Sequence, residues 1–128
     1  MPITFTGFSN ITKKNVDELD PSDEVLYTNN SDVWVSTGYT SNVSLDCRYG
    51  EYIELCDIIY RLSETVQLPS PSDSFAEMCE EYLSSLQEVE KYFNDLESDH
   101  EHFWYKGLFT ELYNVIYNAS NNGVLIIT

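Results

Sequence analysis

The sequence predicts an α+β fold in which a small, mainly antiparallel sheet of about four or five strands packs against three α-helices. Residues 1–47 show short alternating segments separated by turn residues, which are typical of strands. Residues 50–119 carry apolar residues at spacings of three and four, which are typical of helices. Residues 123–128 add a short apolar run that predicts a C-terminal strand. The length of 128 residues fits a single domain spanning residues 1–128.

The strand-rich N-terminal part is expected to contain four strands. Ile3–Phe8 alternates partially and predicts the first. Glu24–Thr28 and Asp32–Thr37 predict two more, joined by an Asn-Asn-Ser turn, because asparagine tolerates the left-handed backbone of tight turns. Val43–Cys47 alternates cleanly and predicts the fourth. The spacing of the last three strands predicts a meander, and the polar segment Asn10–Asp23 is expected to be a loop with at most one short helical turn.

Three helical segments are expected to follow. The first begins near Gly50 and ends before Pro69. The second spans Ser72 to about Leu96, with Ser72 as its N-cap. The third runs from Phe103 to about Ala119 and includes Trp104 in its apolar face. The terminal strand is uninterrupted in its apolar character, so we expect it to be covered on both faces and central in the sheet.

The second helical segment has two different faces. One is an unbroken apolar stripe, formed by Phe75, Cys79, Tyr82, Leu86, Val89, Phe93 and Leu96. The opposite face carries five acidic residues, Glu77, Glu80, Glu81, Glu88 and Asp95. Between Asp73 and Glu101 the chain has ten acidic residues and one basic residue, Lys91. On a continuous helix this would be roughly one acidic group per 4 Å, close to the one charge per roughly 3.4 Å of a DNA strand.

Repulsion within this acidic face, together with its charge density, suggests that it is a partner-binding surface. Glu77 would repel both Glu80 and Glu81 at helical neighbour spacing, each pair destabilising the helix by about 0.2–0.5 kcal/mol. Like charges that repel each other on a helix, with no basic residue nearby to compensate, suggest that the residues are kept for a function rather than for stability. We therefore predict that the five acidic residues of this face bind a partner. Asp17, Glu18 and Asp20, from a second acidic segment, are predicted as secondary partner-binding residues.

The charge balance restricts the class of partner. Twenty-two acidic residues oppose six basic residues, giving a net charge of −16. Such a chain is repelled by nucleic acid and by anionic membranes, so we expect neither to bind directly and a basic protein to be the partner. No apolar run is long enough to span a membrane, and the N-terminus does not resemble a signal peptide, so we expect a cytoplasmic protein, in the host cell if it is phage-encoded. The three cysteines are expected to be reduced.

Motifs for catalysis, cofactors or metals are missing from the sequence. There is no nucleophile elbow, no P-loop and no dinucleotide fingerprint. Asp99-His100-Glu101-His102 is the only metal-like cluster, but its histidines are two residues apart rather than four, and we interpret it as a turn between helices. The sequence therefore favours a protein that is not an enzyme and has no cofactor.

These properties lead to one principal hypothesis and two main alternatives, beside a third, an enzyme with no recognisable motif. In size, charge and lack of catalytic motifs the chain resembles phage counter-defence inhibitors, namely anti-restriction and anti-CRISPR proteins. That resemblance implies a DNA mimic that inhibits a nuclease or another DNA- or RNA-handling enzyme by occupying its basic cleft. The first alternative is an immunity protein that neutralises a basic toxin. The second is a structural or scaffold subunit that oligomerises through its apolar stripe; the oligomeric state is left open.

Overall fold

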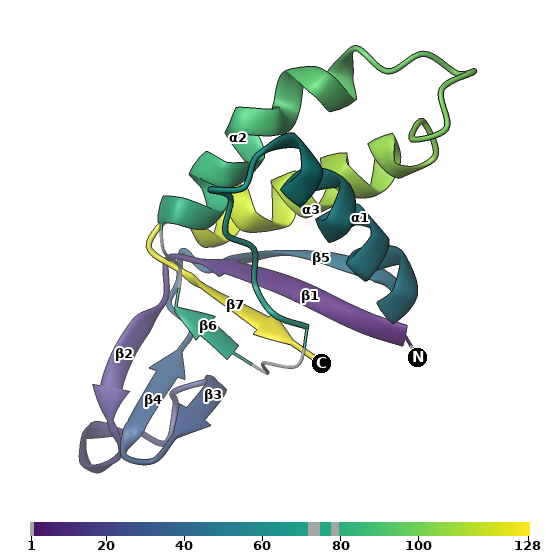
Figure 1. Ribbon diagram of the computed structural model, residues 1–128. Helices are drawn as coiled ribbons and strands as arrows, with labels where there is room; N and C mark the ends of the chain where they lie inside the picture. The colour runs from purple at the N-terminus through teal and green to yellow at the C-terminus, as the bar shows by residue number, and fades with distance from the viewer. Residues whose placement is uncertain (1, 72–74, 78–79) are drawn as a thin grey trace.

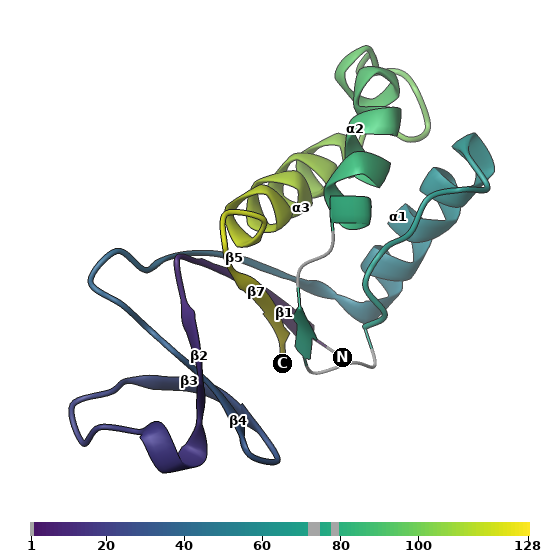
Figure 2. The same cartoon turned by 90° about the vertical axis from the view of Figure 1, so that its left-hand side faces the viewer.

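The computed structural model describes residues 2–71, 75–77 and 80–128, with the backbone alone for residues 75–77 and 80. It confirms the α+β class: the described residues form three α-helices and two antiparallel sheets. The helices lie together on one face of the larger sheet, and the smaller sheet extends away from them (Figures 1 and 2).

The larger sheet has the strand order β5-β1-β7-β6. Its strands are β1 (Pro2–Ser9), β5 (Ser41–Arg48), β6 (Phe75–Glu77) and β7 (Val124–Ile127). β1 pairs with β5 along its whole length, from Pro2 opposite Arg48 to Ser9 opposite Ser41. The C-terminal strand β7 lies between β1 and β6, which confirms its expected internal position.

The smaller sheet has the order β2-β4-β3. Its strands are β2 (Thr12–Asn15), β3 (Val25–Asn29) and β4 (Asp32–Val35), and a short 3₁₀ turn, η1, covers Val16–Glu18. The β3–β4 hairpin is confirmed, with Asn30 at a positive φ of 56° in its turn. The predicted meander is wrong, because β4 pairs with β2 while β5 joins β1 in the other sheet. The segment of β2 was expected to be a loop, but it forms a strand because it pairs with β4.

The described helices are α1 (Tyr49–Leu62), α2 (Glu80–Asn94) and α3 (Tyr105–Ala119). The first and third helices are confirmed, although α3 begins after Phe103 and Trp104 rather than including them. None of the described helices combines the length and the apolar character that crossing a membrane requires.

The predicted long helix from Ser72 to Leu96 is wrong in its first part. Phe75–Glu77 forms strand β6, and α2 starts only at Glu80; Ser72, Asp73 and Cys79 lie outside the described residues. β6 pairs with β7, Phe75 lying opposite Ile126. This pairing satisfies backbone groups on the side of β7 that faces away from β1, and these groups would otherwise need other partners.

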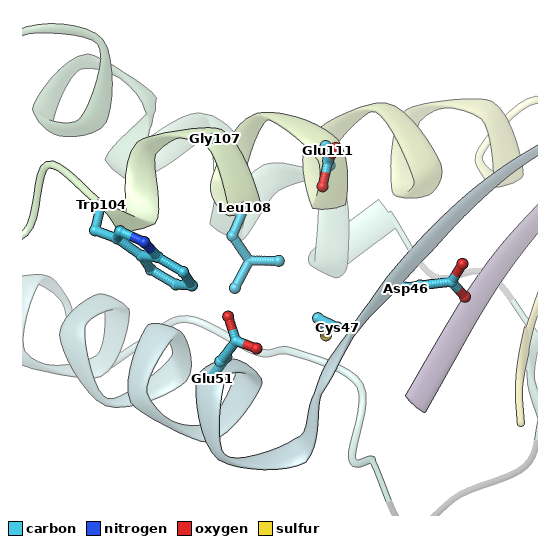
Figure 3. Close-up of a pocket in the computed structure, with 7 residues that line it drawn as sticks. All are labelled: Asp46, Cys47, Glu51, Trp104, Gly107, Leu108 and Glu111. Carbon is cyan, nitrogen blue, oxygen red and sulfur yellow. The ribbon is translucent and has the colours of Figure 1, made fainter. Parts of the chain in front are cut away.

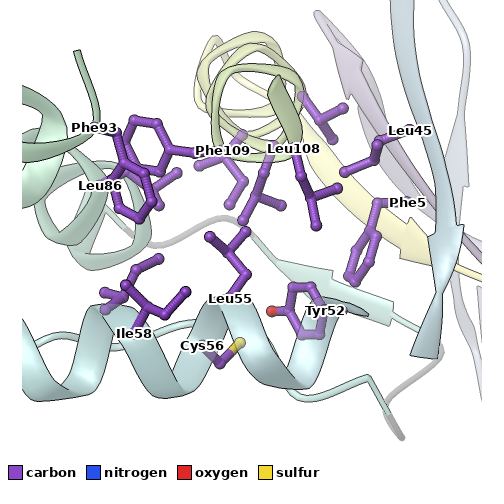
Figure 4. Packing of buried hydrophobic residues seen from close by; sticks show 14 of the residues in the cluster. Phe5, Leu45, Tyr52, Leu55, Cys56, Ile58, Leu86, Phe93, Leu108 and Phe109 are labelled. Carbon is purple, nitrogen blue, oxygen red and sulfur yellow. The ribbon is translucent and has the colours of Figure 1, made fainter. Parts of the chain in front are cut away.

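The main core lies between the larger sheet and the helices. From α2, Leu86, Val89 and Phe93 are buried, and the Phe93 ring stacks on Phe109 of α3 with centroids 4.3 Å apart. In Figure 4 Leu86 and Phe93 lie beside Phe109 at one end of the cluster, while Phe5 of β1 and Leu45 of β5 lie at the other end, near Tyr52 of α1. α3 passes very close to β1, since a Cβ at Gly7 would overlap the main-chain oxygen of Val115. Only glycine fits at this crossing.

A second, smaller core lies where the two sheets meet. Ile11, Trp34 and Val124 are buried together, with Phe8 and Ile126 packed against them. Part of the larger sheet is therefore covered on the face away from the helices as well. This explains why β7 is apolar on both of its faces.

Candidate partner-binding surface

The acidic residues predicted on the long helix are only partly brought together. Glu81 and Glu88 are exposed on α2, and Asp95 is exposed one residue beyond its end. Spacings of seven residues place them along one side of the helix, about 10 Å apart. Glu77 lies on strand β6 instead, and Glu80 is the first residue of α2 with only its backbone described.

This arrangement removes two of the arguments made from the sequence. Glu77 does not share a helix with Glu80 and Glu81, so the predicted repulsion at helical spacing is absent. α2 has four acidic residues in 15, which at about 1.5 Å per residue is one per roughly 6 Å. The acidic face is therefore less densely charged than a DNA strand.

The second acidic segment lies at the other end of the molecule. Asp17 and Glu18 are exposed on η1, and Asp20 is exposed in the loop that follows it. Figure 2 shows this loop at the far end of the smaller sheet, well away from α2. The two predicted sets of residues therefore do not form one continuous surface.

Hydrogen bonds organise this second segment internally. The main-chain N–H of Ser22 donates to Asp20 Oδ1 at 3.0 Å, and this bond lowers the pKa of Asp20 below its usual value. The main-chain N–H of Asp20 donates to Asp23 Oδ2 at 2.9 Å, and Lys14 Nζ lies 2.9 Å from the same oxygen. Both bonds lower the pKa of Asp23, the main-chain bond more strongly. These carboxylates serve the loop's own structure.

Most of the negative charge belongs to the helical part of the chain. Residues 49–119 contain fifteen acidic and three basic residues, a net charge of −12, out of −16 for the whole chain. Of those three basic residues, half-buried Lys106 is engaged at the end of α2, where its Nζ donates to the main-chain oxygen of Asn94 at 3.1 Å. The helical layer therefore presents many carboxylates with little compensation.

Helix α1 contributes acidic residues that the sequence did not single out. Glu54 and Asp57 are exposed and line a cavity of about 330 Å³ together with Arg61 and Tyr105. The Tyr105 hydroxyl donates a hydrogen bond to Glu54, which joins the start of α3 to α1. These acidic residues of α1 therefore lie beside the start of α3, with Arg61 among them.

The Asp99–His102 cluster is a turn between α2 and α3, as expected. The His102 main-chain N–H donates to His100 Nδ1 at 3.0 Å, and the Tyr92 hydroxyl lies 2.7 Å from His102 Nδ1. The two imidazole rings are 5.1 Å apart and both contact Tyr92. Within the described part of the chain, no group of three or more His, Cys, Asp or Glu side chains is arranged to hold a metal ion.

A further cavity of about 270 Å³ opens between β5, the first turn of α1 and the first turns of α3. Figure 3 shows Trp104, Glu51 and Leu108 converging on this space, with Glu111 farther along α3. Trp104 was predicted as a core residue of the third helix, but its side chain is 63% exposed. Only the fold brings these residues together, since they come from separate segments of the chain.

The two cysteines among the described residues, Cys47 and Cys56, do not have reactive thiols. Burial, with Glu51, Asp46 and Glu111 nearby, raises the pKa of Cys47 to about 11, and burial raises that of Cys56 to about 11. Both thiols are therefore protonated near neutral pH, and the thiolate is the reactive form.

Comparisons of the chain with protein-family models, with curated proteins and with solved structures find no match. The surface chemistry of this chain is therefore the basis for inferring its function.

Proposed function

We propose that this protein is an acidic, protein-binding inhibitor whose helical layer occupies the basic nucleic-acid-binding cleft of a nuclease or another DNA- or RNA-handling enzyme. A phage counter-defence role, such as anti-CRISPR or anti-restriction activity, is the setting in which such an inhibitor would act. The partner is a basic protein, and inhibition consists of excluding nucleic acid from its cleft.

The observation that carries the proposal is the uncompensated charge of the helical layer. The three helices and the loop between α2 and α3 carry a net charge of −9, out of −12 for residues 49–119. Among the described residues, no basic side chain lies within ion-pair distance of Glu81, Glu88 or Asp95. Glu88 accepts a hydrogen bond from the Ser63 hydroxyl at 2.6 Å, but none of the three carboxylates has a basic partner within the described part of the chain. They are available to the basic groups of another protein, and they accelerate its association by electrostatic steering.

A basic cleft is the complement that such a surface favours. Nucleic-acid-handling enzymes line their clefts with Lys and Arg to neutralise phosphates. An acidic protein surface can engage the same side chains, even when its charge density is lower than that of DNA. Exact mimicry of a DNA strand is not required, since the surface has only to compete for the cleft.

The scaffold alternative requires an apolar stripe that is exposed on the second helical segment. Leu86, Val89, Phe93 and Leu96 are all buried within this chain. These four residues of the stripe are therefore not available for contact with a second copy. The immunity-protein alternative uses the same acidic surface, and the identity of the partner distinguishes it.

The test compares two triple charge reversals that match in number but lie at opposite ends of the molecule. The first replaces Glu81, Glu88 and Asp95 by Lys, and the second replaces Asp17, Glu18 and Asp20 by Lys. Each raises the net charge from −16 to −10. The immobilised wild-type chain is presented at low salt with purified restriction nucleases, CRISPR effector nucleases and toxin nucleases, and cleavage of DNA or RNA by each bound enzyme is then measured.

The proposal predicts that at least one nuclease binds and is inhibited, and that the first reversal weakens inhibition at least tenfold while the second changes it little. A bound toxin nuclease, with the others unbound, would favour the immunity role. Binding that leaves cleavage unchanged would contradict the inhibitor. Equal loss in both variants would show that net charge, rather than the helical layer, is responsible.

A further inference from the structure

The cavity beside Trp104 combines an aromatic wall, an apolar floor and carboxylates. The Trp104 side chain forms one wall and is 63% exposed, whereas Leu108 beneath it is buried. Glu51 comes from α1 and Glu111 from α3, so the two carboxylates approach from different elements. In Figure 3 the Asp46 carboxylate points away, to the other side of β5, where the Thr4 hydroxyl donates to it.

Gly107 is a separate reason to regard this cavity as a built site. It lies in the first turn of helix α3, where most other residues would stabilise the helix more than glycine does. A Cβ at Gly107 would meet nothing within 4 Å, so the packing of this chain does not require glycine there. The missing side chain leaves the cavity open at the expense of helix stability.

The size of the cavity suits one side chain rather than a whole ligand. Its volume of about 270 Å³ lies just below the roughly 300–1,000 Å³ typical of small-molecule sites. A neighbouring, more open hollow shares Glu51 and Trp104 with it and is also lined by Arg48 and Tyr105, and we take this hollow as the mouth of the cavity. A side chain reaching in from a partner would pass through this mouth.

The electrostatics favour a cation in this space. Glu51 and Glu111 each contribute to raising the pKa of the neighbouring Cys47, after burial, so both carboxylates make the local potential negative. The N-termini of α1 and α3 lie nearby, but each carries only about half a positive charge, against two full carboxylates. Arg48 is the one basic residue at the mouth; its side chain is 86% exposed and its Nε is 4.0 Å from Glu51 Oε1, so it does not fill the cavity.

We propose that this cavity binds an arginine side chain of the basic partner, with the guanidinium stacked on Trp104 and hydrogen-bonded to Glu51 or Glu111. Arginine fits better than lysine because its planar group both stacks on indole and pairs with carboxylates. The proposal rests on the proposed function, since it names the anchor through which the acidic surface holds its partner. Trp and Arg in such pockets are the residues that most often dominate interface energies.

The first test uses N-acetyl-arginine amide as the probe and the indole N–H signals of the two tryptophans as the readout. Trp34 is 4% exposed in the smaller core and serves as an internal reference. The signal of Trp104 should shift with a dissociation constant in the millimolar range, while that of Trp34 stays in place. The citrulline analogue, which is neutral, and inorganic phosphate, which helix N-termini attract, should not bind. Equal binding of citrulline, binding of phosphate or no shift at Trp104 would each overturn the arginine site.

The second test plugs the cavity without disturbing the fold. Gly107→Leu should weaken arginine binding at least tenfold and leave the protein at least as stable as wild type. The matched control is Gly50→Leu, because Gly50 is also on a helix with open space at its Cβ but does not line this cavity. Wild-type arginine binding in the Gly107→Leu variant would overturn the proposal.

The two proposals fail in different ways. If the α2 reversal abolishes inhibition of a bound nuclease but Gly107→Leu and Trp104→Ala do not, the arginine anchor is wrong and the inhibitor stands. If N-acetyl-arginine amide binds at Trp104 while no nuclease is bound or inhibited, the cavity stands and the proposed function is wrong.

Discussion

Reversing the charge at the two ends of α2 should change stability in opposite directions. Glu81 is the second residue of α2, where the helix dipole favours a carboxylate, whereas Asp95 follows the last residue, where the dipole disfavours one. Each of Glu81→Lys and Asp95→Lys raises the net charge by two, so any general relief of repulsion is the same in both. The difference between the variants therefore reports the local effect of position.

The structure sets the size of this difference. A charge near a helix terminus contributes about 0.3–1 kcal/mol at low salt. Both residues are exposed, and Lys106 already donates to the main-chain oxygens at the end of α2, so the lower end of the range applies. Summed over both reversals, the Asp95→Lys variant should be more stable than the Glu81→Lys variant by about 1 kcal/mol, or a few degrees in Tm.

The assay measures urea and thermal unfolding of both variants, with circular dichroism as the readout, at low and at high salt. The difference should be present near 10 mM salt, where the Debye length is about 30 Å, and nearly vanish near 1 M, where it is about 3 Å. A Glu81→Lys variant as stable as Asp95→Lys at low salt would refute the reasoning. So would a difference that persists at high salt, because it would come from packing rather than charge.

Three further predictions concern stability. Phe93→Ala should lower the free energy of unfolding by about 3–5 kcal/mol in urea titrations, because a fully buried ring stacked on Phe109 is removed; a loss below 1 kcal/mol would contradict the described core. Tyr52→Phe should cost about 1–3 kcal/mol by the same measurement, since the main-chain oxygen of Pro69 loses the hydroxyl that donates to it at 2.6 Å, and no cost would show that this bond is not formed. Because the pKa of Asp23 is lowered in the folded protein, its ionised carboxylate stabilises the fold fully above the usual value of 3.8, and this stabilisation is lost as the pH falls through the lowered native pKa. The free energy of unfolding in urea should therefore fall more steeply with acid in the wild type than in Asp23→Asn. Parallel pH profiles of the two proteins would argue against this role of Asp23.

The sequence predicted those elements whose patterns are complete within a short segment. The three helices and five of the strands repeat their apolar residues at local spacings, so residue order alone was sufficient. β6 was missed because Phe75 lies at helical spacing before Tyr82 and Leu86, and the pattern cannot reveal that β7 offers an open edge. β2 was missed because Thr12–Asn15 is polar, and only its pairing with β4 makes it a strand.

Strand partners and the cavity were beyond what periodicity reveals. Alternation identified the segment that became β5, yet whether it joins β4 or β1 depends on long-range contacts. The cavity is assembled from Glu51, Trp104 and Glu111, which have no relation in sequence. Trp104 looked like the start of an apolar stripe, but α3 begins one residue later and leaves the ring in solvent.

The most direct measurement of the central claim is competition between this protein and nucleic acid for one purified partner. With a nuclease that the chain binds, the concentration of protein needed for half-inhibition is determined at increasing concentrations of catalytically inert DNA or RNA. The account predicts that this concentration rises in proportion to the nucleic acid, because both occupy the same basic cleft. Inhibition that does not depend on the nucleic-acid concentration would place the binding site elsewhere and contradict the account.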